Sequence, residues 1–187
     1  MPKFVVSAAI VGSMLMLAGC DTTSAIAGYS PSTTNVIAFQ TALKPKGAVV
    51  QVGDFGAAAD VANPTCRMAG ALDVSQGKRP EQYVRDALQT ELFTAQVYDV
   101  NAPVAITGSL DQLEVNTFGT GSWTLGLTVR SSVDPVGYRV TTVRQFKSSY
   151  SAYSACQNAT NAFAPTVQQL IGQVVSNPGF SKLVGMN

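Results

Sequence analysis

Ser75 and Lys78 are the two residues of this chain whose types and spacing best match a catalytic pair. In an S-x-x-K arrangement, a lysine that has lost its proton activates the serine, and both side chains must lie on one helical face. Here the pair precedes Pro80 in a segment without helical periodicity, and no S-D-N or K-T-G element accompanies it. We therefore expect the spacing to have no catalytic meaning.

The carboxylates and the absence of histidine also argue against a catalytic site. Asp111 and Glu114 lie in a strand-like run, where positions three apart face opposite sides unless a bulge intervenes, so we expect two solvated charges. Asp54 ends a predicted strand, where either a ligand contact or a turn-initiating role is possible. The 187-residue chain contains no histidine, which excludes Ser-His-Asp and Cys-His devices and histidine-ligated zinc. The sequence predicts no catalytic residue, no metal site and no cofactor.

The first twenty residues, Met1 to Cys20, have the layout of a secretory signal peptide. Lys3 precedes an uncharged, largely apolar run that ends in Leu17-Ala18-Gly19-Cys20. This tetrapeptide resembles the lipobox of bacterial lipoproteins. The resemblance implies cleavage after residue 19 and a lipid on Cys20. Two alternatives are an uncleaved transmembrane anchor, for which the run is short, and a secreted protein with an ordinary cysteine at position 20.

The lipoprotein resemblance implies a location on the periplasmic side of a bacterial membrane. Asp21 is similar to an inner-membrane retention signal of enteric lipoproteins, although the outer membrane remains an alternative. Cleavage removes Lys3, which leaves 11 of the 12 basic residues against 11 acidic ones. A neutral mature chain gives no electrostatic case for nucleic-acid binding.

Two cysteines remain in the mature chain, Cys66 and Cys156. In an oxidising compartment an even pair is expected to form a disulfide, here joining a loop to the region near the start of the last helix. Two buried thiols are the alternative. We therefore predict a Cys66–Cys156 disulfide that closes a loop of 90 residues.

The hydropathy pattern predicts one domain of strands and helices over residues 47–187, after a flexible tether over 20–46. Residues 47–55 are apolar on both faces, which favours a central strand, and 56–79 read as a long loop. A helix follows over 80–95. Strand-like runs then cover 104–115, with a bulge near Asp111, 123–130 and 138–146, before a last helix that begins near Ser154.

This order predicts an α+β fold, a two-layer sandwich with a mostly antiparallel, curved sheet of four or five strands and two helices on one face. The βαβββα order, the stretch ALQTELFTAQVYDV and the Trp123 strand resemble small periplasmic lipoproteins of the YajG type and the first domain of TolB-like proteins. The resemblance implies an envelope protein that acts by contact, and it transfers no catalytic residue.

Four cations on the two late strands form a candidate basic contact face, with a solvated sheet face as the alternative: Arg130, Arg139, Arg144 and Lys147. The sequence thus favours a noncatalytic, lipid-anchored protein that binds or positions a protein partner in the cell envelope. A pocket for a small amphiphile or glycan between sheet and helices is the second hypothesis, and a hydrolase is the third.

Overall fold

The computed structural model describes residues 28–186. Their helices and strands, in chain order, are α1 (Thr33–Leu43), the short 3-10 helix η1 (Lys44–Lys46), β1 (Gln51–Ala57), β2 (Thr65–Cys66), β3 (Gly70–Ala71), α2 (Pro80–Thr94), β4 (Ala105–Asn116), β5 (Gly121–Ser131), β6 (Tyr138–Phe146), α3 (Ala152–Ser176) and α4 (Phe180–Leu183). The predicted signal peptide, Cys20 and Asp21 lie outside the described residues.

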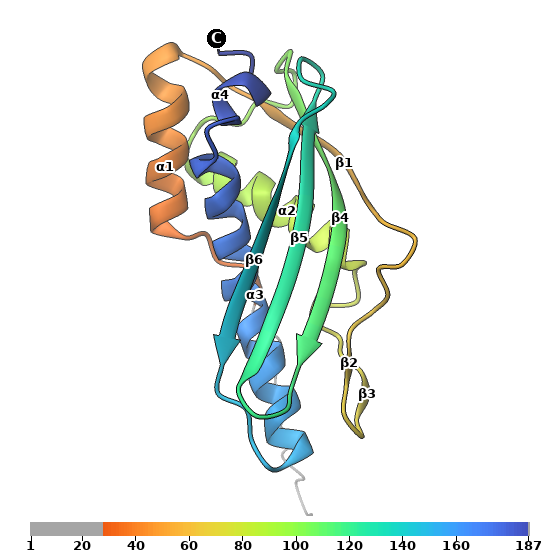
Figure 1. Cartoon of the computed structure of the whole chain (residues 1–187). Coiled ribbons are helices and arrows are strands. Elements are labelled where there is room, and N and C mark those ends of the chain that lie inside the picture. The colour runs from red at the N-terminus through yellow and green to blue at the C-terminus, as the bar shows by residue number, and fades with distance from the viewer. Residues whose placement is uncertain (1–27, 187) are drawn as a thin grey trace, which may run out of the picture.

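The main sheet has the strand order β1-β4-β5-β6 (Figure 1). β1 runs parallel to β4, which it reaches through α2, and the other neighbours are antiparallel. This mixed sheet packed against helices confirms the predicted α+β class. The long loop before α2 contains a small separate hairpin, β2–β3, that the sequence did not reveal.

The strand predicted to be central, β1, is an edge strand, so that prediction was wrong. The pairing of β1 with β4 shifts register between Val52 and Phe55. Both side chains are therefore buried although they are three residues apart, and the strand reads as apolar on both faces. Only at its start does the predicted strand have a second neighbour, where Val50 forms an isolated parallel bridge with Tyr98.

The predicted bulge in β4 is confirmed. Pairing with β5 shifts between Leu110 and Gln112, so that Leu110 and Leu113 both face the core. β5 follows the predicted alternation, with Trp123 and Leu125 fully buried. These two central strands supply much of the apolar face of the sheet.

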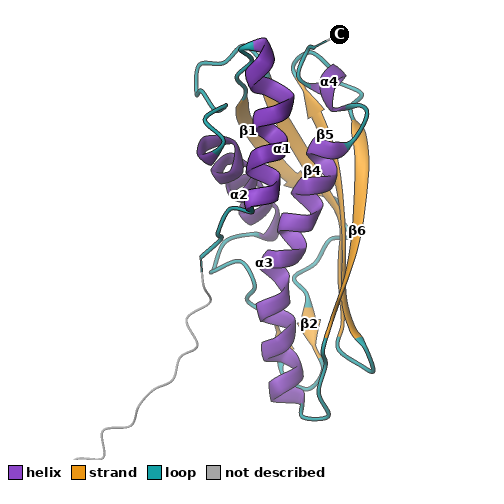
Figure 2. Cartoon of the chain, turned by 90° about the vertical axis from the view of Figure 1, so that its left-hand side faces the viewer, coloured by secondary structure: helices purple, strands orange, loops and turns teal. Residues whose placement is uncertain are grey.

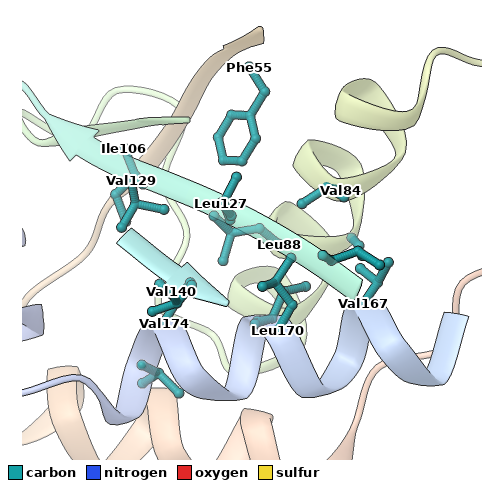
Figure 3. Packing of buried hydrophobic residues seen from close by; sticks show 14 of the residues in the cluster. Phe55, Val84, Leu88, Ile106, Leu127, Val129, Val140, Val167, Leu170 and Val174 are labelled. Carbon is teal, nitrogen blue, oxygen red and sulfur yellow. The ribbon is translucent and has the colours of Figure 1, made fainter. Parts of the chain in front are cut away.

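The helices cover one face of the sheet, as predicted (Figure 2). α2 packs mainly on β1, and α3 packs on β5 and β6. Figure 3 shows the contact between the layers, where Leu127 of the sheet lies near Leu88 of α2 and Leu170 of α3. The core is a continuous apolar layer between sheet and helices.

The predicted tether is wrong for residues 33–46, which fold as α1 and η1. α1 lies over α2 and α3 on their far side from the sheet (Figure 1). Its inward positions are four residues apart, Asn35, Phe39 and Leu43, and all three are buried. The folded domain therefore begins well before residue 47. Within residues 28–186, no helix has the length and hydrophobicity needed to span a bilayer.

Candidate functional site

Three loops meet at one end of the sheet, the lower end in Figure 1. They are the β2–β3 hairpin, the β4–β5 turn and the segment from β6 to the start of α3. Cys66 of β2 and Cys156 of α3 form the predicted disulfide there, with Cα atoms 5.8 Å apart. The bridge fixes the hairpin to the helix, since little regular structure does so otherwise. We call this region the disulfide end.

A pocket of about 570 Å³ opens at the disulfide end, and it brings residues from all three loops together. Arg67 of the hairpin places its guanidinium carbon 4.7 Å from the centre of the Phe118 ring. Its Nη2 donates a hydrogen bond to the carbonyl oxygen of Ser149. Lys147 and Tyr150 complete the rim. The lining contains two cations and no acidic side chain.

Large apolar side chains are exposed around this pocket. Met68 is 98% exposed, Phe118 62% and Tyr153 69%, and Tyr150 is fully exposed. Isolated exposed apolar residues are ordinary on soluble proteins, but grouping on one end marks a contact surface. The disulfide end is therefore the surface of the described chain that is best suited to bind another molecule.

The serine–lysine pair does not have a catalytic arrangement. The Ser75 hydroxyl donates to the Lys78 backbone carbonyl at 2.5 Å. The Lys78 ammonium forms an ion pair with Asp86 at 2.6 Å. The Lys78 side chain therefore contacts a carboxylate and not the Ser75 hydroxyl, whereas the S-x-x-K mechanism needs the amine beside the hydroxyl. The geometry agrees with the expectation drawn from the spacing.

Asp54 lines a second pocket, of about 450 Å³, between the end of β1 and the start of α2. The cations that line this pocket already form ion pairs with acidic side chains of the protein. Asp86 lies 3.0 Å from Arg85 as well as accepting from Lys78, and Glu81 lies 3.0 Å from Arg79. Paired cations distinguish this second pocket from the pocket at the disulfide end, whose cations have no acidic partner in the lining.

Asp111 and Glu114 act separately on the sheet face that the helices leave uncovered. Asp111 accepts a hydrogen bond from the Thr128 hydroxyl at 2.5 Å and lies 3.8 Å from Arg139. Glu114 accepts from the Gln112 side chain at 3.0 Å. The two carboxylates are thus held by different partners and do not form an acid–base pair.

The four cations of the predicted basic face do not share one face. Arg139 pairs with Thr128 on the uncovered face, where Arg130 also lies by its alternation along β5. Arg144 is paired directly with Trp123, so its side chain belongs to the helix-covered side at the sheet edge. Lys147 lies beyond the strand in the pocket at the disulfide end. The prediction of a single basic face was therefore wrong.

A buried carboxylate joins α1 to the domain. Glu91 of α2 is fully buried, and its Oε1 accepts from the Tyr29 hydroxyl at 2.6 Å, from the Ser32 amide at 2.8 Å and from Asn35 Nδ2 at 3.2 Å. Burial, and then the hydrogen bond to Glu91, raise the pKa of Tyr29 far above its ordinary value. This contact fixes where the chain enters the domain.

The space between sheet and helices, where the second hypothesis places a ligand, is filled by side chains. Trp123 of β5 and Phe163 of α3 have ring centroids 5.1 Å apart, and the indole donates to the Ala159 carbonyl at 2.8 Å. Tyr83 of α2 packs on the other side of Phe163, at 5.4 Å. No group of three or more metal-ligating side chains occurs among the described residues.

Of the residues that form the pocket, the sequence analysis named Lys147 as a candidate contact residue and missed the aromatic ones. Phe118 follows the predicted strand 104–115 and precedes a glycine-rich turn, and Tyr150 and Tyr153 lie in a serine-rich connection. Aromatic residues in otherwise polar turns were the available signal, because such segments are normally solvated. Glu91 was also missed, although it interrupts the apolar stripe of its helix.

Among the comparisons with known proteins, the one with solved structures found similar chains. No protein-family model matches this chain, and the comparison with curated proteins gave no match. Among solved structures, it is similar to a DUF330 protein of Xanthomonas campestris, with 11% identity and a TM-score of 0.49 over 68% of this chain and 84% of that one. A hypothetical protein of Chlamydia trachomatis gives 8% identity and a TM-score of 0.48 over 75% and 99%. Similarity at this level assigns no function.

Proposed function

We propose that this protein is a noncatalytic, lipid-anchored protein of a bacterial cell envelope that binds a protein partner through its disulfide end. The grouping of exposed apolar side chains around an uncompensated basic pocket is the observation that carries the binding role. The resemblance of Leu17-Ala18-Gly19-Cys20 to a lipobox supports the anchor. The resemblance to YajG-type and TolB-like proteins supports an action by contact.

The proposed mechanism is tethering. A lipid on Cys20 would confine the domain to one membrane surface on the periplasmic side, and confinement raises the local concentration of the binding surface near a membrane-associated partner. Each buried methylene of an acyl chain contributes about 0.8 kcal/mol, so several chains give durable attachment. In this scheme the domain needs no cofactor and no nucleic acid.

The experiment has two readouts on the protein purified from its native membrane. Mass spectrometry of the amino-terminal peptide is expected to show an acylated Cys20 after removal of residues 1–19. Affinity purification from crosslinked envelopes is expected to recover the same partner repeatedly, with much lower yield from a Cys20→Ser variant. An unmodified thiol at Cys20, or the absence of a reproducible partner, contradicts the proposal.

A further inference from the structure

Arg67 has hydrogen-bonding capacity that the described chain does not use. Its Nη2 donates to the Ser149 carbonyl, but its Nε is buried and has no hydrogen-bond partner among residues 28–186. A buried donor without an acceptor destabilises the structure that holds it. Phe118 lies against one face of the guanidinium.

The second cation of the pocket is also uncompensated. Lys147 is exposed, and its backbone carbonyl accepts from the Asn158 side chain at 2.9 Å, which fixes the main chain beneath it. Neither Lys147 nor Arg67 belongs to an ion pair within the described residues. Two unpaired cations line one pocket that contains no acidic side chain, which favours an anionic ligand. The planar guanidinium of Arg67 favours a carboxylate, because the two groups can form paired hydrogen bonds.

The pocket also offers apolar surface beside the charge. The exposed rings of Phe118 and Tyr150 line the pocket together with the two cations. A volume of about 570 Å³ is within the range that accommodates a few side chains of a bound segment. Charge alone would favour a bare anion, whereas these rings add affinity for an apolar group attached to it.

We infer that the pocket binds an extended segment of the partner protein that places a carboxylate next to an aromatic or aliphatic side chain. The carboxylate pairs with Arg67 and Lys147, and the apolar side chain packs on Phe118 and Tyr150. The inference rests on the proposed function and specifies the chemistry of its partner. Charge complementarity carries it, because the uncompensated cations and the apolar rings are adjacent.

The test uses the mature protein with its disulfide intact and four fluorescent peptides with one Gly-Ser host sequence. The guest dipeptides are Asp-Phe, Asn-Phe, Lys-Phe and Asp-Ser, and fluorescence anisotropy measures binding. We expect the Asp-Phe peptide to bind at least tenfold more tightly than the other three. Arg67→Gln and Phe118→Ser are each expected to lower its affinity about tenfold.

Two further variants separate binding from folding. Lys147→Gln leaves the backbone contact of that residue intact, and we expect it to weaken Asp-Phe binding about threefold. Arg130→Gln removes an exposed cation from the uncovered sheet face and is expected to change nothing. Equal binding of all four peptides, or binding of none, overturns the inference.

Vesicles of phosphatidylcholine with phosphatidylglycerol provide the competing outcome. If the same variants abolish vesicle binding while the peptides are not discriminated, the surface is a membrane contact and the inference is wrong. The result also separates the two proposals. Recovery of a partner from envelopes without peptide discrimination refutes the partner chemistry alone, whereas failure of both experiments refutes the proposed function as well.

Discussion

The two ends of the sheet differ in whether their charged side chains are paired within the protein. At the disulfide end, Arg67 and Lys147 have no acidic partner among the described residues, and aromatic side chains around them are exposed. At the opposite end, which holds the β5–β6 turn and α4 (Figure 1), Asp134 is buried and accepts from Lys182 at 2.9 Å. An end that satisfies its own charges serves the fold, whereas one that leaves them unpaired is available to a ligand.

The turns at the two ends also differ in the interactions that hold them in place. Within the opposite turn, the Asp134 amide donates to the Ser131 hydroxyl at 2.9 Å, and the Ser131 amide donates to the Asp134 carbonyl at 3.0 Å. Phe180 and Leu183 of α4 are buried beside it. At the disulfide end, the Cys66–Cys156 bridge joins the β2–β3 hairpin to α3.

Removal of the bridge should have the largest effect. The Cys66→Ser, Cys156→Ser double variant loses a link that closes 90 residues, and we expect a loss of about 2–5 kcal/mol in the free energy of unfolding. Urea unfolding measures the loss. Hydrogen exchange should show extra local opening at the disulfide end and only the global change near Asp134. Equal local changes at both ends would contradict the comparison.

A glycine in each turn gives a matched pair of smaller changes. Gly137 in the β5–β6 turn has a φ of +63°, and an added Cβ would lie 1.8 Å from the Val129 carbonyl oxygen. Gly119 in the β4–β5 turn has a φ of +58° but open space around it. We expect Gly137→Ala to cost about 3 kcal/mol, from backbone strain and steric clash, and Gly119→Ala about 1 kcal/mol.

Thermal unfolding of the two glycine variants measures this difference. The wild-type protein and a variant at exposed Gly56, where an added Cβ meets no atom within 4 Å and φ is not positive, serve as references. Equal losses at Gly119 and Gly137 would show that the two turns are equally constrained.

The ion pair at the opposite end predicts a dependence on pH. The hydrogen bond from Lys182 is the main cause that lowers the pKa of Asp134 below its ordinary value of 3.8. Its contribution to stability is therefore present above about pH 4 and is lost as the pH falls through the lower, folded-state pKa. Asp134→Asn should destabilise the protein at pH 7, and the difference from wild type should shrink below pH 4. A difference independent of pH would argue against the pair.

The smallest effect on stability is expected from the exposed aromatic side chains. Phe118→Ser and Tyr150→Ser should each change the free energy of unfolding by no more than about 0.5 kcal/mol, because surface substitutions remove little buried area. Circular dichroism during urea unfolding measures this. A loss above 2 kcal/mol would mean that these rings serve the fold and not an interface.

Local patterns were sufficient to predict the elements with a clear periodicity. The alternation from Trp123 to Val129 identified β5, and the change of phase around Asp111 identified the bulge, because a strand exposes only one face to the core. The stripe of α2 was predictable from its local spacing, and the disulfide because one pair of cysteines remains after Cys20. The helix α3 starts slightly earlier than predicted, with Ser151 as its N-cap.

The remaining features depend on contacts between distant parts of the chain. α1 has a narrow buried stripe, and the amide of its N-cap residue Ser32 donates to Glu91, 59 residues away, so composition alone indicated a tether. The pocket at the disulfide end combines three loops that the bridge and the sheet register bring together. Neither the position of Arg67 over Phe118 nor its unpaired Nε can be read from sequence spacing.

Site-specific photo-crosslinking in living cells tests most directly the claim that the disulfide end is the binding surface. Benzoylphenylalanine would replace Tyr150 at that end or Val136, an exposed residue of the opposite turn. We predict a single reproducible adduct from position 150, its loss when Arg67→Gln is added, and none from position 136. An adduct from position 136 alone, or one at 150 that persists with Arg67→Gln, would contradict the account.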